Sequence, residues 1–185
     1  MMESNARVVA DIVDNIRRIF QFINEHSKKV KRETGLTGPQ LWAIKTIAES
    51  STMNVSDLAH RIYLHPATVV GILDRLEING LVKRVRSKED RRVVKVQLTM
   101  QGKALVKNAP AVVQGLLVSG LEHLSDQKLA TIGDGLSGLV DILGVKSIPP
   151  KLIGSREVNV PKKRIRHSHK ARVHSKHPGL KKKVS

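Results

Sequence analysis

A change of hydrophobic period at Gly80 constrains the fold of this chain more than any other feature of its sequence. Before it, apolar residues within 69–76 recur at spacings of three and four, which is the period of one helix face. Pro66 suits the first turn of that helix with His65 as its N-cap, and Gly80 suits the position after its end. After it, β-branched runs flank the polar stretch 87–92, which is typical of a β-hairpin with a charged tip. The pattern therefore predicts a helix followed at once by a two-stranded hairpin.

Two shorter helices are predicted on the N-terminal side of this unit. Thr37 as N-cap and Gln40 as the third helical residue form a capping box that opens a helix ending near Ser50. Ser56 is the N-cap candidate of a helix of about two turns, which a tight turn separates from Pro66. Helix, tight turn, helix and basic hairpin is the order of a winged helix-turn-helix. In that fold one helix enters the DNA major groove, and the hairpin reaches phosphates or the neighbouring minor groove.

Long amphipathic helices are expected on both sides of the winged unit. The first spans residues 1–33, where apolar side chains follow the helical period. After the hairpin, a helix over 101–121 is expected to bend at Pro110, because a proline in mid-helix removes a hydrogen bond. A further helix ends near Leu143. These terminal helices have no core of their own, so we expect 1–33 and 101–143 to be dimerisation helices that pack against a second copy of the chain.

The expected fold is therefore mainly α, in the order α-α-α-α-β-β-α-α. Residues 1–145 form one winged helix-turn-helix domain, with its DNA-binding lobe at about 37–100. Residues 146–185 contain 13 Lys+Arg, one acid, Glu157, and no aromatic residue. Such a segment cannot bury enough apolar surface to offset its ordering entropy, so we expect this basic tail to be disordered when alone.

The charge of the chain points to a polyanionic partner. With 33 Lys+Arg against 16 Asp+Glu, the net charge is +17, and the basic tail carries +12 of it. Double-stranded DNA is the expected partner. A second concentration of charge lies in the hairpin, where seven basic residues stand against Glu89 and Asp90. They are Lys83, Arg84, Arg86, Lys88, Arg91, Arg92 and Lys95.

Several function classes are excluded by what the sequence lacks. It contains no cysteine, which rules out a disulfide framework, a cysteine-ligated metal and a thiol nucleophile. No pair of histidines on one helix has the spacing of metal ligands, so solvated or singly bonded histidines are expected instead of a metal site. No paired carboxylates, Ser/His/Asp pattern or glycine-rich phosphate loop indicates an enzyme or a cofactor. With no apolar stretch long enough for a membrane and no signal peptide, a soluble, cytoplasmic and nucleoid-associated protein is expected.

A set of short motifs is shared with one known family. These are Leu36-Thr37 with Gln40, Leu58-Ala59, Thr68-Val69, Leu73-Asp74-Arg75-Leu76-Glu77, Gly80-Leu81-Val82 with Arg84, Glu89-Asp90-Arg91-Arg92, and Leu98-Thr99 with Gly102. Over about residues 36–105 the chain thereby resembles the MarR-type winged helix-turn-helix transcriptional regulators. The resemblance implies a homodimer that binds a pseudo-palindromic operator and usually acts as a repressor relieved by a ligand.

The DNA-binding residues expected from this arrangement fall into three groups. The recognition helix contributes His65, Pro66, Ala67 and Thr68, with Arg75 for a phosphate, and the wing contributes Arg86, Lys88, Arg91 and Arg92. The basic tail adds phosphate contacts from Lys162, Lys163, Arg164, Arg166, Lys181, Lys182 and Lys183. One of Arg91 and Arg92 is expected to be structural and the other to reach DNA. Where the family commonly has polar or charged residues, this chain has Ala67 and Gly71, so specificity is expected to depend on A·T-rich shape and thymine methyls.

Two functions remain open at this point. The first is a homodimeric repressor whose basic tail adds sequence-independent contacts to DNA. The alternative is an architectural, chromatin-like protein in which the tail dominates and the winged domain has little sequence preference. A small-molecule effector is also left open, since no ligand pocket can be derived from the sequence.

Overall fold

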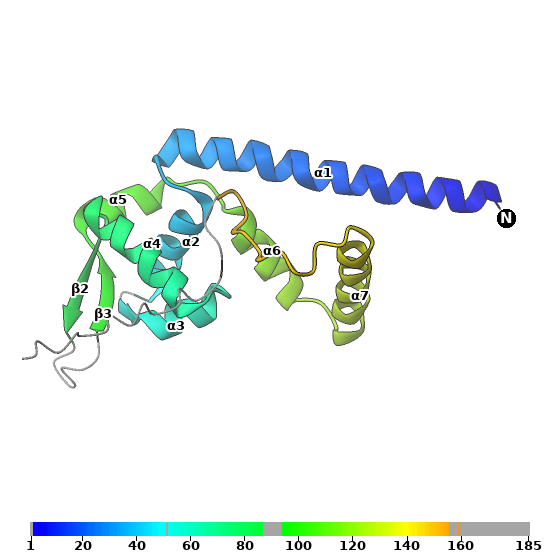
Figure 1. Ribbon diagram of the computed structural model, residues 1–185. Coiled ribbons are helices and arrows are strands. Elements are labelled where there is room, and N and C mark those ends of the chain that lie inside the picture. Colours follow the sequence, from blue (N-terminus) through cyan, green and yellow to red (C-terminus); the bar gives the residue numbers. More distant parts are fainter. Residues whose placement is uncertain (1, 51, 87–93, 156–158, 160–185) are drawn as a thin grey trace, which may run out of the picture.

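The computed structural model describes residues 2–50, 52–86, 94–155 and 159, and in this part of the chain it is mainly helical (Figure 1). The helices are α1 (Met2–Thr34), α2 (Gly38–Glu49), α3 (Val55–Arg61), α4 (Pro66–Ile78), α5 (Met100–Lys107), α6 (Val113–Glu122) and α7 (Asp126–Ile142). The strands are β1 (Thr52–Asn54), β2 (Val82–Arg86) and β3 (Val94–Leu98). The predicted winged helix-turn-helix is thus confirmed, with α3 and α4 as the helix pair and β2 and β3 as the wing.

Local signals set the ends of α4 as predicted. His65 is the N-cap, and its Nδ1 accepts a hydrogen bond of 3.2 Å from the Ala67 N–H. Pro66 occupies the first turn, where an N–H would have no partner within the helix. Gly80 has φ +68°, and the Leu81 N–H beyond it bonds back to the Leu76 carbonyl at 2.9 Å. Because glycine adopts this left-handed conformation without a Cβ clash, only three residues separate the end of α4 from the start of β2.

The junction between the wing and α5 explains the Leu98-Thr99-x-x-Gly102 motif. Thr99 caps α5 by accepting a 3.0 Å bond from the Gly102 N–H, and its hydroxyl donates to the Gly80 carbonyl at 2.6 Å. A Cβ at Gly102 would collide with the Leu81 carbonyl oxygen, so only glycine allows α5 to approach this closely. The motif therefore joins the end of α4 to the start of α5.

Two details of the predicted helices are wrong. Asn54, not Ser56, caps α3, because its Oδ1 accepts from the Asp57 N–H at 2.7 Å. The helix expected over 101–121 is broken, not bent: α5 ends at Lys107 and α6 begins only at Val113. Pro110 lies within this break, where its missing N–H and its ring prevent the helix from continuing.

A third strand, β1, was absent from the expected order of elements. It pairs antiparallel with β3, so the sheet order is β1-β3-β2. Three residues are too few to show a strand period, and the pairing of Met53 with Val96 joins positions far apart in the sequence. Only the folded chain brings these two segments together.

The core of the α2–α5 lobe lies between α2, the helix pair and the sheet. Leu41, Ile44 and Ile47 of α2 are completely buried. They pack in one hydrophobic cluster with side chains of α3, α4 and the sheet, namely Leu58, Ile62, Val69, Ile72, Leu73, Leu76, Val82 and Val96. This cluster holds α4 with one face inward and the opposite face free for contact with a partner.

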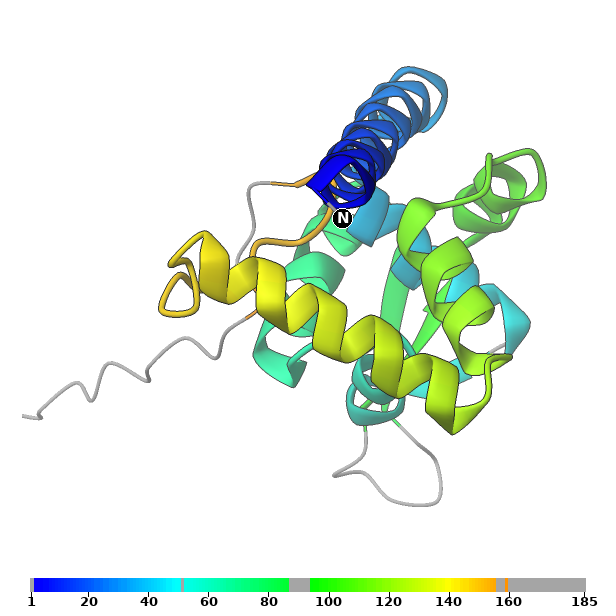
Figure 2. The same cartoon turned by 90° about the vertical axis from the view of Figure 1, so that its right-hand side faces the viewer.

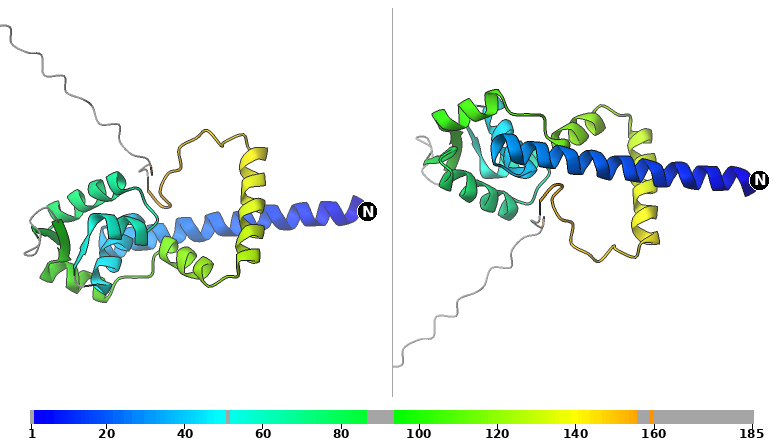
Figure 3. Two further views of the ribbon diagram at one scale, coloured as in Figure 1. Left: turned by 90° about the horizontal axis from the view of Figure 1, so that it is seen from below. Right: turned by 90° about the horizontal axis from the view of Figure 1, so that it is seen from above.

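The long terminal helices stand apart from this lobe. Figures 1 and 3 show α1 extending as a straight rod beyond the α2–α5 lobe, and Figure 2, which looks along α1, shows α7 crossing the front of the molecule. No residue of α7 is buried. Apolar side chains such as Ile19 and Phe20, which are 55% and 62% exposed, remain uncovered on α1. The protomer alone leaves these apolar faces in contact with solvent.

The segment after α7 packs back onto the folded domain. Leu152 is buried in the core cluster, and the Ile153 carbonyl accepts a hydrogen bond from Gln114 Nε2 on α6. Asn159 accepts a 2.9 Å bond from the His65 N–H through its Oδ1. We call residues 150–155 together with Asn159 the C-terminal strap. The expectation of disorder from residue 146 onward is therefore wrong for the strap, because Leu152 finds an apolar site that sequence composition does not reveal. Residues 160–185 lie outside the described part of the chain.

One side chain ties the wing to α4. Arg84 of β2 donates from Nη2 to Asp74 Oδ1 at 2.6 Å and from Nη1 to Glu77 Oε2, and its backbone N–H donates to Glu77 Oε1 at 3.1 Å. Charge-assisted hydrogen bonds of this kind are the stronger class. Arg84 thus fixes the angle between β2 and α4, and we call these three residues the wing clamp.

We expect Arg84→Ala to lower the free energy of unfolding by about 1 kcal/mol, because Asp74 and Glu77 lose their partner while water still screens them. Urea denaturation followed by circular dichroism measures this loss. Lys83→Ala, on the exposed side of the same strand, is the control and is expected to change stability little. Equal stabilities of the two variants would show that the wing clamp contributes nothing.

Candidate nucleic-acid interface

The outward face of α4 carries few groups that can form hydrogen bonds with bases. Its inward face is formed by the buried residues Val69, Ile72, Leu73 and Leu76. Positions 67, 71 and 74 lie opposite that face at 100° per residue, with Val70, 42% exposed, beside them. This surface is small and largely apolar, which agrees with the residue types at Ala67 and Gly71. Val70 was missed as a candidate in the sequence, where it could be read only as one more apolar residue of the helix.

Two of the predicted base-contacting residues, His65 and Thr68, differ in their local contacts. His65 is exposed, but its Nδ1 is engaged in capping α4. The Thr68 hydroxyl is buried and has no hydrogen-bond partner among the described residues. A buried hydroxyl without a partner carries a desolvation cost, which rotation toward a DNA acceptor would relieve. A contact between Thr68 and a base therefore stays a prediction that requires this rotation.

Arg75 lies on one flank of α4, away from the wing. It lines a hollow with Ser27 and Lys31 of α1 and with Ser155 of the C-terminal strap. The flank of α4 that carries Arg75 therefore lies next to α1. Its contact with a DNA phosphate remains a prediction.

The wing presents its basic residues in two different ways. Lys83 and Arg86 are exposed on β2, whereas Arg84 is turned inward in the wing clamp. The net effect on Arg84 is a raised pKa: burial lowers it, but the hydrogen bond and charge of Asp74 and the charge of Glu77 raise it by more. Lys88, Arg91 and Arg92 fall outside the described residues. Of the wing residues proposed to contact DNA, only Arg86 belongs to the described part of the chain. It is the last residue of β2.

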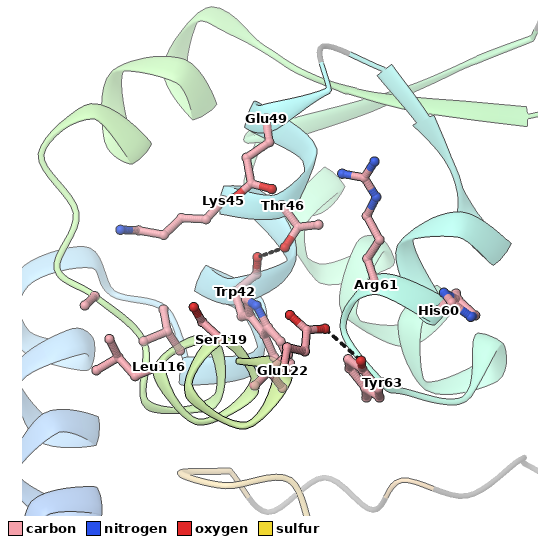
Figure 4. A pocket seen from close by; sticks show the side chains of 14 residues that line it. Trp42, Lys45, Thr46, Glu49, His60, Arg61, Tyr63, Leu116, Ser119 and Glu122 are labelled. Atoms are coloured by element: carbon pink, nitrogen blue, oxygen red, sulfur yellow. Dashed lines mark hydrogen bonds between the residues drawn. The ribbon is translucent and has the colours of Figure 1, made fainter. Parts of the chain in front are cut away.

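A separate hollow of about 500 Å³ lies between α2, the end of α3 and α6 (Figure 4). Trp42 and Lys45 line it from α2, and Ser119 and Glu122 from α6. Its walls are chemically mixed, since Glu49, His60 and Arg61 also contribute to them. The size falls within the range of small-molecule pockets in proteins.

Tyr63 connects this hollow with the turn of the helix pair. Its φ is +51°, a left-handed conformation that costs a residue with a side chain about 1 to 2 kcal/mol. The phenol donates a 2.7 Å hydrogen bond to Glu122 Oε1 at the end of α6, as the dashed line in Figure 4 shows. This bond and the negative charge of Glu122 raise the pKa of Tyr63 above its ordinary value of 10.0. The turn that leads into α4 is thus attached to α6.

The described residues contain neither a cluster of metal ligands nor a membrane-spanning helix. No group of three or more His, Asp or Glu side chains within them is arranged to hold a metal ion. No helix in the described part of the chain has the length and apolar content needed to span a membrane.

Comparisons with known proteins point to one family. Residues 36–94 match the model of the MarR family. The chain is 28% identical over 131 residues to the uncharacterized HTH-type transcriptional regulator YsmB of Bacillus subtilis, covering 71% of this chain and 90% of that protein. It is 32% identical over 120 residues to the organic hydroperoxide resistance transcriptional regulator of the same organism, covering 65% and 80%. Among solved structures, Streptococcus pneumoniae FabT in complex with DNA is 23% identical, covering 72% of this chain and 96% of that one, with a TM-score of 0.49.

The pKa of Tyr63 can be measured directly, because it is the chain's single tyrosine. In the ultraviolet absorbance titration of tyrosinate we expect a midpoint above 10.0, which falls toward 10.0 in Glu122→Gln, since the amide carries no charge. The contact stabilises the fold fully below pH 10.0, and its contribution is lost as the pH rises through the raised pKa of Tyr63. Asp126→Asn, another acid removed nearby in the sequence, is the control. A wild-type midpoint at or below 10.0 would contradict the contact.

Proposed function

Since this chain belongs to the MarR family of winged helix-turn-helix transcriptional regulators, we propose that it is a homodimeric repressor that binds a pseudo-palindromic DNA operator. The observation that carries the proposal is the wing clamp. By holding β2 against α4, Arg84 keeps the outward face of α4 and the exposed cations Lys83 and Arg86 on one rigid unit. A helix for the major groove and a basic strand for the adjoining backbone are then presented together. Such a regulator acts where the chromosome is, in the cytoplasm.

The dimer part of the proposal rests on uncovered apolar surface. In the described part of the chain, α1, α6 and α7 leave large hydrophobic side chains exposed to solvent. They include Val9, Ile12, Ile19, Phe20, Leu116, Leu117, Leu121, Leu136 and Val140. Large exposed apolar patches mark interaction surfaces in soluble proteins. A second copy brings matching faces, and its two-fold symmetry mirrors the symmetry of a palindromic operator.

Specificity in this proposal depends on shape and methyl groups more than on bidentate hydrogen bonds. Ala67 and Val70 can contact thymine methyls, and Gly71 allows the backbone of α4 to approach the base edges. His65, Pro66 and Thr68 flank these positions at the start of the helix. Arg75, Arg86, Lys88 and one of Arg91 and Arg92 supply phosphate or minor-groove contacts. We accordingly expect an operator with A·T-rich segments, where groove width is read by the wing.

A small-molecule effector is part of the proposal. The hollow lined by Trp42, Lys45 and Glu122 adjoins both α6 and the turn before α4. A ligand that enters it would compete with the bond between Tyr63 and Glu122. Since that bond joins a dimerisation helix to the start of α4, the hollow is suitably placed to transmit ligand binding to the DNA-reading surface.

Arg86 is the described wing residue to test first. Arg86→Ala is expected to weaken binding to all duplexes and to reduce the slope of log affinity against log salt by about 1, because one phosphate contact and its released counterion are lost. Fluorescence anisotropy over a salt series measures this slope. Lys128→Ala, an exposed lysine on α7, is the matched control and should leave the slope unchanged. An unchanged slope for Arg86→Ala would remove it from the interface.

Ile19 tests the dimer without disturbing the core of the protomer, because its side chain is 55% exposed. Ile19→Glu is expected to produce monomers or aggregates, since a charge then faces the apolar surface of the second copy. Gln21→Glu introduces the same side chain about 200° around α1 and should leave the dimer intact. Analytical ultracentrifugation separates these outcomes. A dimeric Ile19→Glu protein that still binds its operator would contradict the proposed interface.

The role of the basic tail separates a repressor from an architectural protein. Residues 160–185 contain ten Lys+Arg and no acid, and we propose that Lys162, Lys163, Arg164, Arg166, Lys181, Lys182 and Lys183 contact phosphates. Truncation after Asn159 removes these residues and keeps the C-terminal strap. Truncation is expected to weaken DNA binding and to lower the slope of log affinity against log salt. The ratio of the affinities for operator and scrambled duplexes should stay as large as before, because truncation removes mainly sequence-independent phosphate contacts.

The operator for this test comes from selection of bound duplexes out of a random pool. One enriched palindrome supports the repressor. An unenriched or merely A·T-rich pool, combined with loss of nearly all binding after truncation, would identify the architectural alternative. Salt titrations of full-length and truncated protein on selected and scrambled duplexes complete the comparison.

A further inference from the structure

The C-terminal strap touches three elements that have different roles in the proposed function. At α6, Gln114 Nε2 donates to the Ile153 carbonyl. At α1, Gly154 passes so close to Ser27 that a Cβ at Gly154 would collide with the Ser27 hydroxyl. At the start of α4, the His65 N–H donates to Asn159 Oδ1 at 2.9 Å. The strap therefore connects α1 and α6 to the N-cap of α4.

The strap is seated by burial and by its own backbone. Leu152 is only 7% exposed and belongs to the hydrophobic core cluster. The Asn159 N–H bonds to the Pro150 carbonyl at 3.0 Å, which ties Asn159 to the first residue of the strap. Gly154 has φ +71°, and glycine meets both the left-handed backbone and the close approach to α1. These features indicate a fitted segment and not a chance contact of a polar tail.

The connection matters because a dimer reads two half-sites at once. The distance and angle between the two copies of α4 depend on how firmly each lobe is held against its own dimerisation helices. α1 and α6 pack on α2, and α4 packs on α2 as well. The strap adds a second connection between the same parts, from Ser27 and Gln114 directly to His65.

We propose that the C-terminal strap is a positioning element for DNA recognition, which fixes α4 relative to α1 and α6 and thereby narrows the range of half-site spacings that the dimer accepts. Asn159 and Leu152 are its positioning residues. The inference rests on the proposed function, because half-site spacing has meaning only for a dimer bound to a two-fold operator.

Docking of the strap in solution is tested first, with the chain's lack of cysteine as an advantage. Leu152→Cys places a single thiol at the buried position, and Ile148→Cys places one at a neighbouring position that is 60% exposed. Because a docked strap protects the thiol, we expect Ellman's reagent to label Cys at 152 at least about tenfold more slowly than Cys at 148. Equal rates would overturn the strap itself.

The positioning role is tested on duplexes whose half-sites are moved apart or together by one and two base pairs. Two base pairs rotate one half-site by about 70° around the DNA axis, so wild-type protein is expected to lose about tenfold or more in affinity. Asn159→Ala removes the bond to His65 while leaving Leu152 buried. We expect this variant to lose no more than about threefold on the same duplexes, because a loosely held α4 can follow the displaced half-site.

Three further variants separate positioning from general stability. Asn159→Asp keeps an acceptor for the His65 N–H and should restore the narrow spacing profile, even where its charge lowers overall affinity. Leu152→Asn should broaden the profile as Asn159→Ala does. Ile148→Asn, the matched substitution at an exposed position, should leave the wild-type profile. Thermal denaturation of each variant is measured alongside, since a purely stabilising strap would shift the melting temperature without changing the spacing profile.

The outcomes distinguish failure of this inference from failure of the proposed function. A sharp wild-type profile with a broad Asn159→Ala profile supports the positioning role. Equally sharp profiles for both proteins overturn it and leave the operator-binding repressor intact. A wild-type protein with no preference for any spacing overturns the proposed repressor, and the positioning role with it.

Discussion

The second helix packs against α1, α3, α4, α5, α6, β1 and β3, so nearly every other element takes its place from α2. Leu41, Ile44 and Ile47 have no exposed surface, because neighbouring elements cover the face of α2 on which they lie. An interior of this density transmits displacement, because close-packed side chains have no free volume to absorb it. The position of α4, the helix proposed to read DNA, is therefore coupled to α1 and α6, which are proposed to form the dimer, through their shared packing on α2.

Ion pairs adjust the position of the wing relative to the helices that the apolar core holds together. The hairpin has seven basic residues, and those that the structure describes differ in their surroundings. Arg84 forms ion pairs with Asp74 and Glu77 in the wing clamp. Its guanidinium therefore holds β2 against α4. Arg86 is exposed at the end of the same strand. A count of positive charge thus overstates the number of groups available to phosphates, and the pairing of each cation decides its role.

Side-chain hydrogen bonds also join the start of α4 to α6 and to the C-terminal strap. Tyr63 joins the turn before α4 to Glu122 of α6, and Asn159 joins the N-cap of α4 to the C-terminal strap. Both end within three residues of one another, at the start of the helix proposed to read DNA. Contacts at the start of α4 are well placed to control its orientation, because a small rotation there displaces the whole helix. Both a response to a small ligand and a fixed half-site spacing would depend on that orientation.

The sequence by itself determined the features that depend on neighbouring residues. Pro66 and Gly80 mark the ends of α4, Thr99 and Gly102 mark the start of α5, and the change of period between them predicts the wing. Caps, left-handed glycines and amphipathic periods are local, since each concerns one turn of chain. They were sufficient for the mainly helical fold and for the family resemblance.

Only the tertiary structure decided the features that join distant positions. The pairing of β1 with β3, the burial of Leu152 by a segment of tail-like composition, and the bond between Tyr63 and Glu122 each bring together residues separated by tens of positions. Arg84 was counted in the sequence only as one of the basic residues of the hairpin, and its structural role follows from its contacts with Asp74 and Glu77 in the folded chain. Composition cannot reveal such contacts, because the free energy of burying Leu152 or pairing Arg84 exists only once the surrounding surface has formed.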